Sequence, residues 1–447
     1  MTPGPDQRPA RLRRAAFAVA AVLTLVAIPV VAWRWSEDPT PAPSAPMTLS
    51  TIGTAGATGA ADSGADRTGQ RSVQGAAVVR ALIEAIGPAG RDAGAVVAPG
   101  DALARDQVRG IAEASRVLGV ESWSGRFVAE DPELSAASDA RSWVGHAEFS
   151  AEVPGRGRLS FETAVRVVET SDGPRFGGTG ATAADGAKVG AAPTWWSEPL
   201  RVRREGRITV LAPAATSAEG LVRQSRTALR QVRTVLPRWK GRLVVELPAT
   251  QAAAETALDA EPGSYSGIAA VTSTPVGVAD ASEAAYVLLN PPVWNALGPR
   301  AAQVVLTHET VHVARGATRT AAPLWVVEGV ADYVALRDGG VSARHAAARY
   351  LDKVRDHGLP RRFPTEDDFD ARRRGLGATY ESAWLACRLI AKEYGERRLL
   401  RFADALDAGM GLEQAFRVEL GTTPRHFLRL WRTDLARLAG IDRGRVS

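Results

Sequence analysis

An H-E-x-x-H motif lies in the range Leu306 to His312. His308 and His312 are four positions apart, so on a helix their imidazoles project from one face and can bind a single metal ion. Glu309 follows His308 by about 100° around a helix of ~3.6 residues per turn. Its carboxylate therefore flanks the metal instead of ligating it, which is the place for a general base that activates a water molecule.

A second segment, Trp325 to Tyr333, offers two carboxylates four positions apart, Glu328 and Asp332. Glu328 can supply a third ligand, because a catalytic zinc takes three protein ligands and keeps one position open for water. Asp332 shares that helix face, where it can accept the outer N–H of a ligand histidine and fix the tautomer of the ring. Residues typical of helix ends bound these segments: Pro299, Gly316 and Pro323.

H-E-x-x-H followed by W-x-x-E-G-x-A-D-Y resembles the gluzincin metallopeptidases, the thermolysin-like superfamily. In that superfamily a glutamate downstream of the motif is the third zinc ligand, and here Glu328 lies sixteen positions after His312. The resemblance implies Zn²⁺ bound by His308, His312 and Glu328. It also implies Glu309 as the base and Asp332 as the partner behind a ligand histidine.

The resemblance is confined to one part of the chain. Its motifs span residues 306–333, and a weaker similarity in helix order continues to the C-terminus, whereas the first two hundred residues are not covered. The metzincin alternative requires glycine and histidine at the third and sixth positions after the second motif histidine. Arg315 and Thr318 occupy those positions, so that branch is excluded.

The elements around the motif predict an α+β fold for residues 205–447. Strand and helix patterns alternate before the motif, and helical patterns follow it. The expected strands are Ile208–Leu211, Arg242–Leu247, Gly267–Val278 and Ala284–Leu289. The expected later helices are Val341–Val354, Tyr380–Tyr394, Arg397–Leu406, Leu412–Leu420 and Pro424–Leu438. The resemblance implies a zincin-like, two-lobed metallopeptidase domain, in which a mixed sheet lobe and a mainly helical lobe enclose the zinc at the floor of a cleft.

Two features of this domain bear on the substrate. As an edge strand, Ala284–Leu289 would line the cleft and pair with an extended peptide, although an ordinary internal strand fits the sequence equally. Tyr380 opens a helix and is our candidate for the hydrogen bond to the oxyanion, with ordinary packing as its alternative. Tyr333, His345 and His357 are the other candidates for that role.

Residues 76–204 are predicted to form a separate small α+β domain. A helix over Leu103–Leu118 precedes strand patterns, which favours a cone-like fold of the nuclear-transport-factor type. The expected strands are Glu121–Glu130, Ser142–Val153, Leu159–Thr170 and Leu200–Arg203. We expect His146 to be a structural residue on a strand. Trp195 and Trp196 are expected to pack at the junction with the next domain.

The N-terminal region predicts a membrane protein. Residues 1–14 carry four arginines and are expected in the cytoplasm, and the uncharged residues 15–33 are long enough for one transmembrane helix. A cleaved signal peptide is the alternative, and it also places the later residues outside the cytoplasm. Residues 34–75 are rich in Pro, Ala, Ser and Gly, which predicts a disordered tether.

Charge and cysteine content exclude some classes of partner and of covalent cross-link. The net charge of +6 is spread over many arginines with no compact basic and aromatic array, which argues against nucleic-acid binding. The single cysteine, Cys387, excludes an intrachain disulfide, and its apolar helical surroundings predict a core residue.

The sequence therefore predicts zinc-dependent hydrolysis of a peptide or protein substrate on the extracytoplasmic side of a membrane. Two alternatives stay open. One is a membrane-tethered binding protein with a structural or inactive zinc site, and the other is a chance motif that binds no metal.

Overall fold

The computed structural model describes residues 61–88, 90, 92–154, 157–179, 192–198, 200–274, 285–370, 373 and 375–441. The predicted cytoplasmic segment, the transmembrane helix at 15–33 and the tether up to residue 60 lie outside these ranges. Within them, no helix combines the length and the apolar composition that crossing a membrane requires.

The tether ends earlier than predicted, because helix α1 (Ala61–Ile86) includes residues 61–75. Tertiary contacts explain why these residues are helical. Arg71 forms an ion pair with Glu130 and lies over the ring of Trp143, 5.5 Å from its centroid. The polar first half of the helix is therefore anchored to the sheet, although its composition alone is typical of a flexible chain.

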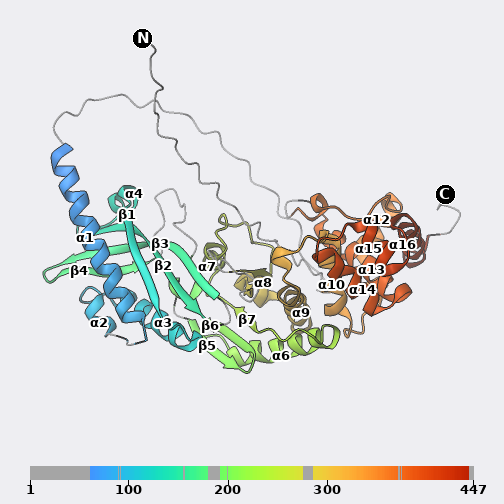
Figure 1. Ribbon diagram of the computed structural model, residues 1–447, viewed down its shortest axis with the longest axis horizontal. Helices are drawn as coiled ribbons and strands as arrows, with labels where there is room; N and C mark the ends of the chain where they lie inside the picture. The colour runs from blue at the N-terminus through green and yellow to red at the C-terminus, as the bar shows by residue number, and fades with distance from the viewer. Residues whose placement is uncertain are drawn as a thin grey trace, which may run out of the picture.

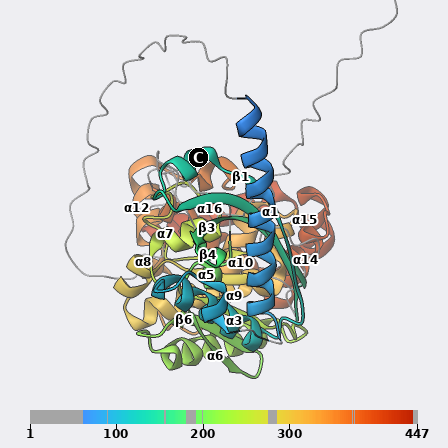
Figure 2. The ribbon, with the colours of Figure 1, turned by 90° about the vertical axis from the view of Figure 1, so that its left-hand side faces the viewer.

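The N-terminal unit packs helices on a four-stranded antiparallel sheet in the order β1-β2-β3-β4. Figure 2 shows α1 along this unit, where it packs against β1. The strands are β1 (Trp123–Glu130), β2 (Ser142–Val153), β3 (Gly157–Thr170) and β4 (Gly173–Thr179). The helices are α1, α2 (Ala93–Val96), α3 (Ala102–Leu118), α4 (Pro132–Ala136) and α5 (Thr194–Ser197). The α+β prediction is correct for this unit, but β4 was not predicted.

A second, mixed sheet has the order β5-β6-β7-β9-β8. Its central strands run parallel, and the two outer pairs are antiparallel. The strands are β5 (Leu200–Glu205), β6 (Ile208–Pro213), β7 (Leu243–Glu246), β8 (Ala270–Ser273) and β9 (Tyr286–Leu289). The helices that accompany it are α6 (Ala218–Val235), α7 (Gln251–Ala257) and α8 (Pro291–Ala296).

Two strand assignments from the sequence need correction. The strand at Leu200–Arg203 belongs to this second sheet and not to the N-terminal unit, since β5 and β6 form a hairpin around Gly206, whose φ is 56°. The strand expected at Ala284–Leu289 is the internal strand β9, and the edge beside it is β8. Sequence periodicity could not settle either point, because the period of a strand does not specify which other strands it pairs with.

The second sheet links the two halves of the molecule through its two faces. Val210 and Val287 belong to a core shared with α6 and the motif helix α9 (Pro299–Arg315), whereas Leu211 and Leu288 belong to a core shared with the N-terminal unit. This alternation is the period of two that a strand imposes on its side chains. Figure 1 shows the resulting order along the long axis: N-terminal unit, second sheet, helical region.

The C-terminal region is helical, as predicted, and its apolar core also includes residues of α6, β8 and α9. Its helices are α10 (Leu324–Leu336), α11 (Ala343–Ala346), α12 (Ala348–His357), α13 (Leu376–Tyr394), α14 (Glu396–Asp407), α15 (Leu412–Leu420) and α16 (Pro424–Ala439). Short 3₁₀ turns lie at Ala317–Arg319 and Glu366–Phe369. Helix α13 begins at Leu376, and not at Tyr380 as expected from the sequence. Gly375 caps its start with a φ of 84°, which glycine adopts readily.

Candidate metal centre

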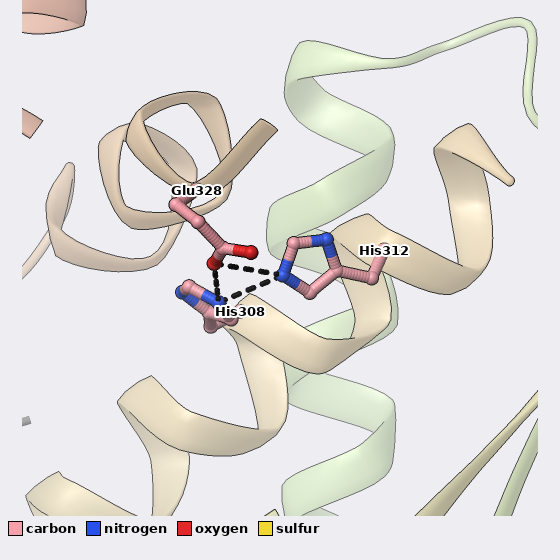
Figure 3. Close-up of side chains that lie close together, drawn as sticks. All are labelled: His308, His312 and Glu328. Atoms are coloured by element: carbon pink, nitrogen blue, oxygen red, sulfur yellow. Dashed lines mark hydrogen bonds and ion pairs between the residues drawn. The ribbon is translucent and has the colours of Figure 1, made fainter. Parts of the chain in front are cut away.

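Three side chains from two helices converge at the interface of the sheet and the helical region. His308 and His312 project from α9 and Glu328 from α10, and all three are at most 1% exposed. The two Nε2 atoms lie 2.8 Å apart, and Oε2 of Glu328 lies 3.1 Å from the first and 3.4 Å from the second. Figure 3 shows the three groups pointing toward one another.

This donor set fits a zinc ion. Two imidazole nitrogens and one carboxylate oxygen form a ligand set of catalytic zinc sites, with metal–ligand bonds of ~2.0–2.2 Å. One ligand atom from each residue lies within 4.8 Å of the other two, which permits all three to reach one ion. Buried polar atoms are almost always paired, and an ion bound between the two facing imidazole nitrogens would satisfy both of them at once.

The charges at the site favour a cation. Burial alone would raise the pKa of Glu328, but the neighbouring imidazoles lower it to about 2, so the carboxylate is ionised. Burial would lower the pKa of His308, yet the carboxylates of Asp332 and Glu328 raise it well above its usual value. A proton and a metal ion compete for such a ring, and metal binding releases the proton.

Asp332 lies directly behind the first histidine. Its Oδ1 is 2.7 Å from Nδ1 of His308, and both side chains are buried. A proton on Nδ1 donates to this carboxylate, which leaves the Nε2 lone pair directed at the point where the three ligands meet. The carboxylates of Glu328 and Asp332, four residues apart on one helix face, therefore both contact His308.

Glu309 is buried beside the ligands and is held by a residue that was not predicted from the sequence. The hydroxyl of Thr272, on strand β8, donates to Oε2 of Glu309 at 2.6 Å and to its backbone carbonyl at 3.1 Å. The other carboxylate oxygen, Oε1, accepts no hydrogen bond from any described residue. Burial raises the pKa of this carboxyl. The only sequence signal for Thr272 was a threonine next to a serine in a short strand, and such a pair is too common to be diagnostic.

Gly329 explains how closely α10 approaches its neighbour. A Cβ atom at this position would lie 2.5 Å from the backbone oxygen of Ala383 and 2.6 Å from Sγ of Cys387, both on α13. Glycine therefore lets the backbones of α10 and α13 come into close contact directly after Glu328. Cys387 is fully buried, as predicted for a core residue, and burial raises the pKa of its thiol.

Of the four candidates for the oxyanion partner, Tyr380 has its ring beside that of a proposed ligand. Its ring centroid is 6.5 Å from that of His308, and Phe369 packs edge-on against it at 5.4 Å. The hydroxyl of Tyr333 instead donates to Glu396 at 2.9 Å. His345 and His357 are exposed residues of α11 and α12.

Comparison with known proteins supports the class that this site defines. Residues 294–357, which include all three proposed ligands, match the family model described as "BSP: Peptidase of plants and bacteria". The match and the buried His-His-Glu group both agree with the zinc metallopeptidase predicted from the sequence.

The similarity to solved structures is weaker. The crystal structure of the M1 zinc metallopeptidase from Deinococcus radiodurans aligns at 16% identity with a TM-score of 0.32. The alignment covers 69% of this chain and 60% of that one, so this chain spans well under the full length of that enzyme. A TM-score of this size does not define a common overall fold. No curated protein matches the sequence.

Proposed function

We propose that this protein is a zinc-dependent peptidase that hydrolyses peptide bonds with an activated water molecule. The observation that carries the proposal is the buried convergence of His308, His312 and Glu328, with Glu309 at their side. His308, His312 and Glu328 would hold the ion, and Asp332 orients the ring of His308. When bound, Zn²⁺ polarises a water molecule and the substrate carbonyl.

Glu309 is the proposed general base and acid. Its carboxylate takes the proton of the attacking water and then passes that proton to the leaving amine. The hydrogen bond from Thr272 fixes one carboxylate oxygen, and the second oxygen, which has no partner among the described residues, is available for this exchange. This assignment follows from position, because Glu309 is next to a ligand but is not one of the three converging groups.

Strand β8 is the proposed support for the substrate. As the edge of the second sheet it has a side that pairs with no other strand among the described residues, and an extended peptide can add there as a further strand. Thr272 lies on this strand and also binds Glu309, so the same element would hold the peptide and position the base. The sequence suggested Ala284–Leu289 as the edge strand that pairs with a peptide. We assign this pairing to the neighbouring strand β8.

Tyr380 is the proposed donor to the oxyanion. We expect Tyr380→Phe to lower kcat about 10²-fold with little change in KM, because the lost hydrogen bond stabilises charge that develops only in the transition state. The measurement is steady-state cleavage of a fluorogenic peptide. Tyr394→Phe, at the other end of α13, is the matched control and should retain wild-type kcat. Equal kcat values for the two variants would assign Tyr380 to packing alone.

Chelation tests the function as a whole. We expect dialysis of the chain against a chelator to abolish cleavage of unfolded casein, and added Zn²⁺ to restore it, with an unchanged far-UV circular dichroism spectrum. This outcome separates an enzyme from the alternative, a membrane-tethered binding protein with a structural or inactive zinc site. For that alternative, the untreated protein would cleave nothing, or chelation would unfold it.

We further propose that the peptidase acts on the extracytoplasmic side of a membrane, attached by one N-terminal helix. The support is the sequence alone: four arginines precede the uncharged residues 15–33. Cell fractionation tests this placement, and recovery of the C-terminal region in the cytosol would refute it.

A further inference from the structure

A cavity of about 280 Å³ lies in the helical region, and none of its lining residues belongs to the metal centre. Helix α12 and the segment that follows it form one wall, and the first turns of α13 form the other. The volume lies near the lower end of the range for small-molecule sites, ~300 Å³. The cavity therefore suits a compact ligand and not a folded partner.

The walls of this cavity carry an excess of positive charge. Lys353, Arg361 and Arg362 line it, and Asp368 is the only carboxylate among its described lining residues. Asp368 is already paired with Arg362, whose guanidinium lies 2.5 Å away and lowers the pKa of that carboxyl to about 2. Lys353 and Arg361 form no ion pair with any described residue, so two cations remain without a counter-charge.

Hydrogen bonds fix the polar side of the cavity that α13 contributes. Ser382 is 2% exposed, and its hydroxyl donates to the backbone oxygen of Thr379 at 2.7 Å. The adjacent Glu381 joins the two walls, because its carboxylate accepts the backbone N–H of Tyr350 at 2.7 Å and lies 3.1 Å from Nε of Arg349. The cavity is thus built by the fold before any ligand arrives, which lowers the entropic cost of binding.

We propose that this cavity binds a small molecule through its carboxylate or phosphate group, at a site separate from the metal centre. Arg361 offers a planar fork of donors and Lys353 a point charge, and both recognise such oxyanions. Val354, Pro360 and Pro364 supply apolar walls for the remainder of the ligand.

The site is linked to the metal centre by shared elements. Asp368 lines the cavity while its neighbour Phe369 packs against Tyr380, and Thr379 immediately precedes that tyrosine. A bound ligand therefore lies within about one helical turn of Tyr380 along α13. Ligand binding in this cavity does not require the proposed peptidase activity, so the two proposals can fail separately.

Isothermal titration calorimetry of the full chain tests the proposal, with inorganic phosphate and succinate as probes and sodium chloride at equal ionic strength as the reference. We expect saturable binding of at least one probe, and the tighter one shows whether phosphate or carboxylate is preferred. In the double variant Lys353→Ala/Arg361→Ala, the Kd should rise about tenfold or more, since two charge-assisted contacts are lost.

The control is Arg397→Ala/Arg398→Ala, which removes the same charge from exposed positions on α14 that form no ion pair with any described residue. It should bind as the wild type does. The proposal is overturned if neither probe binds the wild type beyond the sodium chloride reference. An unchanged Kd in the Lys353/Arg361 variant, or an equal loss in the control, would also overturn it, because binding would then reflect overall charge.

Discussion

Glu309→Gln is expected to keep its zinc and to lose between about 10²-fold and 10⁴-fold in kcat, the contribution typical of a positioned general acid–base group. Glutamine has nearly the same shape as glutamate and can still accept the hydrogen bond from Thr272, so the local packing should survive. It cannot take a proton from water at neutral pH. The measurements are kcat for a fluorogenic peptide and zinc content by elemental mass spectrometry, made on the same preparation.

The matched control for this variant is Glu255→Gln. Glu255 is also buried, at 2% exposed, and accepts hydrogen bonds from Gln251 and from the backbone of Tyr265, but it lies on α7 outside the metal centre. A general penalty for neutralising a buried carboxylate would lower kcat in both variants. A Glu309→Gln enzyme as fast as the wild type would refute the assignment of the base.

His312→Ala is expected to reduce the zinc content from about one ion per chain to nearly none. The variant removes one of the three protein ligands that a catalytic zinc requires, and it also removes the imidazole that does most to lower the pKa of the buried Glu328 carboxyl. Elemental mass spectrometry of both proteins, purified side by side and checked for folding by circular dichroism, gives the answer.

His357→Ala controls for nonspecific loss of metal, since His357 is an exposed histidine away from the ligands and should leave the zinc content unchanged. Two outcomes would contradict the site. Equal zinc in His312→Ala and wild type would mean that the metal binds elsewhere. A folded wild type without zinc would remove the peptidase proposal and favour a tethered binding protein.

The sequence was sufficient for the parts of the site that depend on local geometry. His308 and His312 share a helix face because they are four residues apart, and the same spacing brings Glu328 and Asp332 to one face of the next helix. Both relationships follow from the helical repeat and need no tertiary information. The burial of Cys387 was likewise predictable from apolar neighbours at helical spacing.

The extent of the ordered helices was harder to predict. The polar residues 61–75 have a composition typical of a tether, yet they form the first half of α1. Contacts of Arg71 with Glu130 and Trp143 stabilise them there, and both of these partners lie far along the chain. Composition indicates how much apolar surface a segment can bury, but it contains no information on the partners that a fold provides.

The sequence by itself determined the candidate ligand set, because its metal-binding pattern lies within two short helical segments. Only the tertiary structure decided which strand forms the edge beside those helices, which threonine holds Glu309 and where the cationic cavity lies. Each of these features joins residues that are remote in sequence, such as Thr272 to Glu309 and Lys353 to Ser382. Strand order and side-chain contacts between elements result from the packing of the whole chain, and no local period encodes them.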